Sequence, residues 1–220
     1  SLSAEEAGNY SVAVGRSALQ KQVNSTSTDA YNVAVGFEAG QEITTGLFNT
    51  LLGGLAGDAI TTGTRNIAVG YNALGADTLG SKSVAVGLGT LADQNFTTAT
   101  DAFNTAVGHG AGTAITTGTN NTLIGGVCGD ALTTGVQNVA VGLSALGAMT
   151  AGDKNVAIGN SALSVANVTD GSETFNVAVG YAAGGAVTTG IQNTLIGGLT
   201  ADALTDADFN VAIGYAALTS

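Results

Sequence analysis

The sequence predicts an all-β fold, a parallel β-solenoid built from twelve short coils. Three observations support this prediction: a five-residue strand pattern recurs twelve times, a turn rich in threonine and glycine follows most copies, and the composition suits a narrow core. Glycine supplies 34 of the 220 residues, proline and tryptophan are absent, and 45% of the residues are apolar. Most of the apolar residues are Ala and Val, too small to fill a wide core, and their abundance argues against disorder.

The five-residue pattern, N-[VT]-[AL]-[VIL]-G, divides the chain into 17-residue and 21-residue coils. One longer coil and three shorter coils follow each other in a fixed order, and such periodicity is the signature of a solenoid. Residues 1–10 form a lead-in, residues 11–220 form the solenoid, and its four-coil units are 11–82, 83–154 and 155–220. The copies begin at Ser11, Asn32, Asn49, Asn66, Ser83, Asn104, Asn121, Asn138, Asn155, Asn176, Asn193 and Asn210.

Each pentad reads as a short strand covered on both faces. Side chains alternate along a strand, so Val33 and Val35 point one way and Ala34 the other. Both directions are apolar, which is typical of a strand without a fully solvated face. We expect the Val and Ile side chains to fill the interior and the Ala and Leu side chains to form an uncovered outer stripe.

The second half of most coils ends in Thr-Thr-Gly after an apolar residue, as in Thr44-Thr45-Gly46 after Ile43. This segment predicts a second short strand followed by a glycine turn. Coils stacked about 4.8 Å apart would then form two parallel sheets.

The asparagine that opens most pentads predicts a ladder of stacked side-chain amides along the solenoid. Each amide would bond to the equivalent amide of the neighbouring coil. The ladder comprises Asn32, Asn49, Asn66, Asn104, Asn121, Asn138, Asn155, Asn176, Asn193 and Asn210.

Composition excludes several classes of function. The formal net charge of -11 argues against binding to nucleic acid or to an anionic membrane. No stretch approaches the roughly 20 apolar residues of a membrane helix, so we expect no membrane insertion by this segment. The single cysteine forms no internal disulfide. We also expect a segment of a longer protein, because the first residues, SLSAEEAGNY, contain neither an initiating Met nor an export signal.

An apolar stripe along the solenoid would favour self-association, because large exposed apolar patches mark association sites. The motifs NVAVG, NIAVGYNAL, NVAIGNSAL and NVAIGYAAL resemble the repeats of phage and bacterial tail fibres and of trimeric autotransporter adhesin heads. The resemblance covers residues 11–220. It implies a left-handed, homotrimeric β-roll that is extracellular, on a virion tail fibre or a bacterial cell surface, and serves attachment to a host cell. A monomeric solenoid is the alternative.

No catalytic, cofactor or metal site is expected. His109 is the only histidine, and it follows the pentad glycine in a position held elsewhere by aromatic rings such as Tyr71. Cys128 replaces a small buried alanine. Asp58 and Asp130 are isolated, which disfavours a metal site. The acids are scattered over different coil positions, so no pair faces across a groove, and we expect no enzyme.

The three 21-residue coils, called the long coils below, are the candidates for receptor contact. Their additional residues predict polar loops at one edge, where binding residues commonly lie. Irregular bulges that adjust the twist are an equal alternative. Threonine rows also suggest an ice-binding or carbohydrate-binding module as a second function. The candidate contact residues, for a cell-surface glycan or receptor, are Asn24, Ser25, Thr26, Asn95, Phe96, Thr97, Asn167, Thr169 and Asp170.

Overall fold

The computed structural model describes residues 8–23 and 28–219. It is an all-β parallel solenoid of about twelve coils, and this described part contains no helix. The repeat therefore predicted the fold class correctly. The chain divides into two compact units, residues 1–105 and 106–220, which we describe separately.

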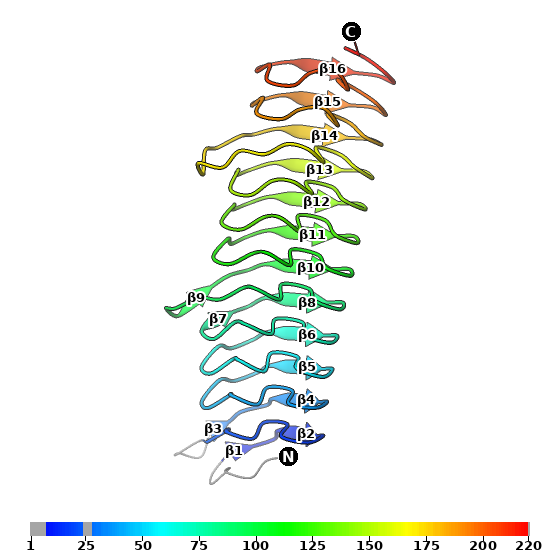
Figure 1. The fold of residues 1–220 in the computed structure, drawn as a ribbon. Coiled ribbons are helices and arrows are strands. Elements are labelled where there is room, and N and C mark those ends of the chain that lie inside the picture. Colours follow the sequence, from blue (N-terminus) through cyan, green and yellow to red (C-terminus); the bar gives the residue numbers. More distant parts are fainter. Residues whose placement is uncertain (1–7, 24–27, 220) are drawn as a thin grey trace. The chain divides into compact units, whose positions relative to one another are not determined.

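In unit 1 each pentad forms one three-residue strand, and consecutive strands pair in parallel (Figure 1). The pairing keeps the repeat in register, so Ala34 lies opposite Leu51 and Leu51 opposite Ala68. Every coil thus places equivalent residues in one column. The strands are β2 (Val12–Val14), β4 (Val33–Val35), β5 (Thr50–Leu52), β6 (Ile67–Val69) and β8 (Val84–Val86).

Unit 2 is built in the same way, with consecutive strands again in parallel and in register. Its strands are β11 (Thr122–Ile124), β12 (Val139–Val141), β13 (Val156–Ile158), β14 (Val177–Val179), β15 (Thr194–Ile196) and β16 (Val211–Ile213). Strand β10 (Thr105–Val107) spans the division between the two units.

The strands face the opposite way from our expectation. Ala34 and Leu51, at the third pentad position, are fully buried, whereas Val35 and Leu52 are each 37% exposed. Alternation along an apolar pentad does not reveal which side is inside. The interior of a narrow coil has room for Ala at the strand, because larger side chains from the rest of the coil, such as Ile43 and Leu74, enter from the other side.

The coils differ in whether the third or the ninth residue carries a large side chain into the core. Six of the twelve coils combine Ala at the third position with Leu at the ninth, as in Ala68 and Leu74, and three others combine Ala with Gly, as in Ala34 and Gly40. The third coil of each four-coil unit instead has Leu at the third position, such as Leu51. A Cβ on Gly40 or Gly57, the ninth residues of two stacked coils, would lie 2.7 or 2.8 Å from the methyl groups of Leu51. One leucine thus fills the space left by two glycines.

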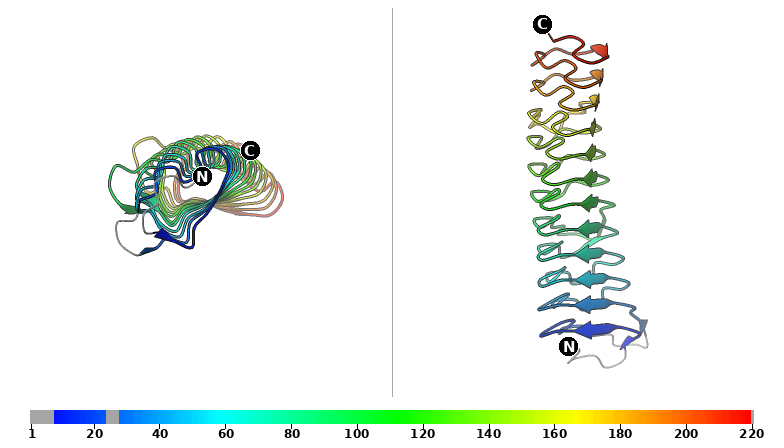
Figure 2. Two further views of the ribbon diagram at one scale, coloured as in Figure 1. Left: turned by 90° about the horizontal axis from the view of Figure 1, so that it is seen from below. Right: turned by 90° about the vertical axis from the view of Figure 1, so that its right-hand side faces the viewer.

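The predicted second sheet through the Thr-Thr-Gly segments is absent from the described residues. These segments are bends that stack through single hydrogen bonds, such as the Thr44 N–H donating to the Thr61 carbonyl at 2.9 Å. The glycine turn follows too soon for an extended ladder to form. Each coil is consequently a flattened loop with its strand along one side, as the two views of Figure 2 show.

Two further pairs of short strands in the described chain join a long coil to the segment that precedes it. In unit 1, β1 (Gly8–Asn9) pairs in parallel with β3 (Thr28–Asp29), and β7 (Gly80–Ser81) pairs with β9 (Thr100–Asp101). In unit 2 the equivalent contact is a single bridge between Asp153 and Glu173. These pairs anchor the base of each protruding loop to the preceding coil.

Candidate functional site

The outward side of the strands forms an apolar surface in each unit, which we call the strand face. It consists of the second and fourth pentad residues. Ile67 in unit 1 and Ile124 in unit 2 are both 41% exposed, although isoleucine is among the residues most often buried. The uncovered apolar stripe expected from the sequence therefore exists, but it is made of Val, Ile, Leu and Thr rather than of Ala and Leu.

An aromatic column borders the strand face in unit 1, formed by the residue that precedes each pentad. The rings of Tyr10, Tyr31 and Phe48 stack with centroids 5.2 and 5.7 Å apart, and the Arg65 guanidinium lies 5.5 Å from the Phe48 ring. Desolvation beside these rings, and then the carboxylate of Asp29, raise the pKa of Tyr31. Sequence analysis missed this column, although Tyr, Phe, Arg or Lys before the pentad was its visible signal.

The other border of the strand face is the residue after the pentad glycine. His109, Tyr71 and Phe37 are all exposed there. Arg16 lies over the Phe37 ring at 5.3 Å. Among the described residues, neither the strand face nor its two borders contain an Asp or Glu.

The asparagine ladder lies inside the coil. The Asn32 Oδ1 atom accepts hydrogen bonds from the Asn49 backbone N–H at 2.9 Å and from Asn49 Nδ2 at 3.2 Å, while Asn49 Nδ2 also donates to the Gly63 carbonyl at 3.0 Å. The ladder residues are buried, apart from the half-buried Asn210 at the last coil. Their side chains satisfy backbone groups between coils, so their role is structural.

Two pentads open with Ser instead of Asn, and a glutamine compensates for each. Gln94 donates from Nε2 to the Ser83 hydroxyl at 3.0 Å and accepts from Asn104 Nδ2 at 2.8 Å. Gln22 makes the equivalent contacts with Ser11 and Asn32 at 3.1 and 3.0 Å.

Long-coil loops protrude from the edge of the coils in both units (Figure 1). Asn24, Ser25 and Thr26 lie outside the described residues. In the second loop Asn95 and Thr97 are exposed, but Phe96 is only 5% exposed, so its ring packs against the coil and is not available to a receptor.

In the third loop Thr169 and Asp170 are exposed and Asn167 is half-buried. A hydrogen bond from the Ser172 hydroxyl and another from its N–H, at 3.0 Å to Oδ1, lower the pKa of Asp170. The loop and the next coil line an open pocket of about 320 Å³. It is lined by Asn167, Val168, Thr169, Asp170, Ser172, Thr189 and Ile191.

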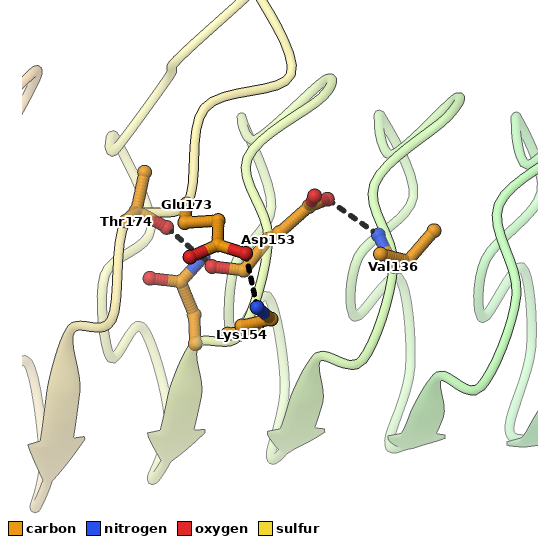
Figure 3. Close-up of polar contacts among 6 residues, drawn as sticks. Val136, Asp153, Lys154, Glu173 and Thr174 are labelled. Atoms are coloured by element: carbon orange, nitrogen blue, oxygen red, sulfur yellow. Dashed lines mark hydrogen bonds and ion pairs between the residues drawn. The ribbon is translucent and has the colours of Figure 1, made fainter.

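A lysine, an acid and an aromatic ring hold the base of each of these two loops, an arrangement we call the lysine clasp. Figure 3 shows the contact of Lys154 with Glu173 and that of Thr174 with Asp153 in unit 2. In unit 2 Lys154 pairs with Glu173 and lies 5.1 Å from the Phe175 ring. Nearby, the Thr174 hydroxyl donates to the Asp153 carbonyl at 2.8 Å. In unit 1 Lys82, Asp101 and Phe103 repeat the clasp, with distances of 2.6 and 4.9 Å.

Two further titratable groups with a shifted pKa, Cys128 and Asp58, lie in different units. Cys128 is buried, its thiol donates to the Gly125 carbonyl at 3.2 Å, and desolvation raises its pKa to about 11, which suits the expected packing role. Burial, with smaller contributions from Glu38 and Glu42, raises the pKa of Asp58. The described residues contain no group of three or more His, Cys, Asp or Glu side chains that could hold a metal ion.

Four of the five Thr-Thr-Gly segments present one exposed threonine rather than two, and in the fifth Thr188 and Thr189 are both exposed. The first hydroxyl is used inside the solenoid: Thr44, Thr61 and Thr133 each donate to the carbonyl of the next coil, at 3.2, 3.0 and 2.9 Å. The second threonine, such as Thr45 or Thr134, is exposed. The surface is therefore a single threonine column.

Comparison of the chain with protein-family models, with curated proteins and with solved structures found no match. Within residues 8–23 and 28–219, no helix is long and apolar enough to cross a membrane.

Proposed function

We propose that this chain is a structural shaft of an extracellular fibre, which associates as a homotrimer through the strand face and serves attachment to a cell surface. The observation that carries the proposal is the exposed strand face, which continues through every coil of each unit. Apolar surfaces of this kind mark association sites. Because each coil repeats the same side chains, a second copy offers a face with matching periodicity.

Charge supports association through this face rather than another. A net charge of -11 makes copies of the chain repel each other. No described acid belongs to the strand face or its two borders, and Asp101 and Glu173, which approach one border, are paired there with Lys82 and Lys154. Copies that meet at the strand face therefore bring no unpaired carboxylate of that face into contact. Three copies, rather than two, are proposed because the NVAVG and NVAIGYAAL motifs resemble repeats of trimeric fibres and adhesins. Three copies close a ring through heterologous contacts.

Absolute mass from light scattering during size-exclusion chromatography tests the assembly. The proposal requires a mass near three times 21.3 kDa. Replacing Ile67 and Ile124 together by Lys should lower that mass, because six buried charges would be introduced into one interface. The matched control replaces the exposed Thr62 and Thr134 by Lys and should leave the trimer intact. A mass near 21.3 kDa for the unchanged chain overturns the proposal.

Attachment is tested separately with the loops. Shortening all three long coils to the length of the other coils should abolish binding of the labelled protein to its target cells while the solution mass still corresponds to three chains. Undiminished binding after this change would assign the loops a purely structural role and leave attachment without support.

A further inference from the structure

The three long-coil loops share a feature that neither the solenoid nor the proposed shaft requires. Each contains the sequence Asn-x-Thr: Asn24-Ser25-Thr26, Asn95-Phe96-Thr97 and Asn167-Val168-Thr169. Asn-x-Thr and Asn-x-Ser are the acceptor sequences for N-linked glycosylation. The pentads do not generate them, because Ala or Leu stands two residues after every pentad asparagine. Elsewhere such triplets begin at Asn9 and Asn120.

Asn95 and Asn167 are held in the same way in the two units. Each occupies the coil position that holds the first threonine of the Thr-Thr-Gly segment in shorter coils. The Asn95 Oδ1 accepts from the Thr78 hydroxyl at 3.0 Å, and the Asn167 Oδ1 accepts from the Thr150 hydroxyl at 2.9 Å. Neither Nδ2 atom donates a hydrogen bond in the described part of the chain. The amide is thus fixed by its oxygen while its nitrogen stays available.

The hydroxyl of each acceptor sequence is also presented. Thr97 and Thr169 are both exposed. In the second loop Phe96 is only 5% exposed, so Asn95 and Thr97 point outward on either side of it, whereas in the third loop Asn167 and Val168 are both half-buried. A transferase that reads the asparagine and the threonine can therefore reach both hydroxyls.

Space and chemistry for a sugar exist beside Asn167. The pocket of about 320 Å³ places the Asp170 carboxylate and the hydroxyls of Ser172 and Thr189 around the acceptor, with Ile191 as an apolar wall. Its volume lies in the range of pockets that receive small ligands. Its carboxylate and hydroxyls are acceptors and donors suited to the hydroxyl groups of a neutral sugar ring.

We propose that Asn95 and Asn167 are acceptor sites for N-linked glycans on the loops of the long coils. The donor is a sugar diphosphate whose second phosphate is esterified to a lipid or to a nucleoside. The Asn Nδ2 atom forms a bond to C1 of the sugar, the bond from C1 to the phosphate oxygen breaks, and the diphosphate leaves with the bonding electron pair. One Nδ2 proton passes to a base of the transferase.

Asn120 provides an internal contrast. It is exposed and begins Asn120-Asn121-Thr122, but its Nδ2 donates to the Thr119 hydroxyl at 3.0 Å. Asn121 is a buried ladder residue, and Thr122 belongs to β11. The folded chain therefore presents this triplet to a transferase much less readily than the loops.

The test uses the full folded chain, a purified soluble asparagine-specific glucosyltransferase and UDP-glucose, followed by peptide mass spectrometry. We expect one hexose at Asn95 and one at Asn167, and none at Asn120. Thr97→Ala and Thr169→Ala should each abolish the hexose at their own loop, whereas Thr97→Ser should retain it. Circular dichroism verifies that these exposed substitutions leave the fold intact.

Two outcomes overturn the proposal. The first is an unmodified folded chain under conditions in which synthetic peptides covering residues 93–99 and 165–171 are modified. The second is a hexose at Asn120 as abundant as those at the loops, because accessibility would then not distinguish the sites. Both mass-spectrometry readouts are independent of the number of chains in the assembly. The glycosylation proposal can therefore be overturned while the trimer proposal stands, and the trimer proposal can be overturned while the glycosylation proposal stands.

Discussion

At the scale of single residues, Leu51 shows how the core accommodates two types of coil. It occupies space that Leu fills from the ninth position in other coils, and it lies against Gly40 and Gly57. Leu51→Ala should lower the free energy of unfolding by about 2–5 kcal/mol, the range for a buried leucine that leaves a cavity. Chemical denaturation monitored by circular dichroism measures this change.

A second substitution distinguishes lost volume from other damage. Gly57 has φ +55°, close to the φ of 55° at Leu74, so its backbone conformation has a precedent with leucine. A Cβ there would lie 2.8 Å from both Leu51 Cδ2 and Ile60 Cδ1, so the leucine fits once Leu51 is shortened and the Ile60 terminal methyl shifts. Leu51→Ala/Gly57→Leu recreates the Ala and Leu pair of the ordinary coil and should recover part of the loss. A double variant less stable than Leu51→Ala alone would contradict the exchange of volume between the two positions.

Asp77 is a buried acid in a column otherwise formed largely by aliphatic residues such as Ile60. Its Oδ2 accepts from Gln94 Nε2 at 2.6 Å, and its Oδ1 accepts from the N–H groups of Gly80 and Phe96 at 3.0 and 3.3 Å. In unit 2 Met149 and Ala166 occupy the same two coil positions as Asp77 and Gln94. Asp77→Met alone should cost about 1–3 kcal/mol, because it leaves buried donors without an acceptor. Adding Gln94→Ala should recover part of this cost.

The pH dependence of stability identifies the carboxyl group itself. Desolvation raises the pKa of Asp77 above the usual 3.8 in the folded chain. As pH rises through 3.8, the unfolded chain ionises first, so the wild type loses stability until Asp77 also ionises in the folded state. Relative to Asp77→Met/Gln94→Ala, the wild type should therefore gain stability as pH falls toward 4. An unchanged difference across this interval would contradict the raised pKa.

At the scale of elements, the sequence predicted the coil boundaries but not the orientation of the strands. The spacing of the pentads located every three-residue strand, because in-register stacking requires equivalent residues at equal intervals. The predicted orientation of the strands was wrong because both sides of the pentad are apolar. Only the complete cross-section of a coil shows that side chains such as Leu74 and Ile43 already fill the interior. The strand predicted at Thr-Thr-Gly does not form, because these three residues favour a strand but are too few for a regular hydrogen-bond ladder.

The loop sites were also only partly predictable. The interval between pentads located the loops in the sequence. The inward direction of Phe96 and the pocket beside Asn167, however, depend on contacts with neighbouring coils. The aromatic column of Tyr10, Tyr31 and Phe48 depends on stacking between equivalent residues of successive coils. The aromatic residues before the pentads are visible in the sequence, but their stacking follows only once the coils are known to be in register.

The lysine clasp gives a prediction at the element scale. Lys154→Ala removes an exposed ion pair with Glu173 and a cation–π contact with Phe175, so it should cost about 1 kcal/mol. Lys21→Ala is the matched control, because Lys21 pairs with Glu42 at 2.6 Å and has no such ring contact. It should cost less. Thermal unfolding and hydrogen exchange of the loop amides measure both effects, and faster exchange of residues 167–173 only in Lys154→Ala supports the clasp.

At the scale of the whole chain, the four-coil unit is the repeat that preserves every column. Deleting residues 83–154 joins Lys82 to Asn155, and the long coil that follows again provides an acid and a ring, now Glu173 and Phe175. Asp77 would face Ala166 instead of Gln94, so the deletion is combined with Asp77→Met to recreate the Met and Ala pair. Because solenoid coils contact chiefly their neighbours, every interface in the shortened chain would have a precedent in the full one.

We therefore expect this shortened chain to keep the β-type circular dichroism per residue and a cooperative unfolding transition. The control deletes residues 83–152 with the same Asp77→Met, which leaves Asp153 and Lys154 as two additional residues before Asn155. The resulting coil length lies between the 17 and 21 residues of the two natural coil types, so the asparagine ladder and the strands are displaced from register. Since a register error interrupts the columns that satisfy buried backbone groups, the control should unfold at markedly lower denaturant concentration. Equal stability of the two deletions would mean that local coil packing, rather than the phase of the four-coil repeat, maintains the solenoid.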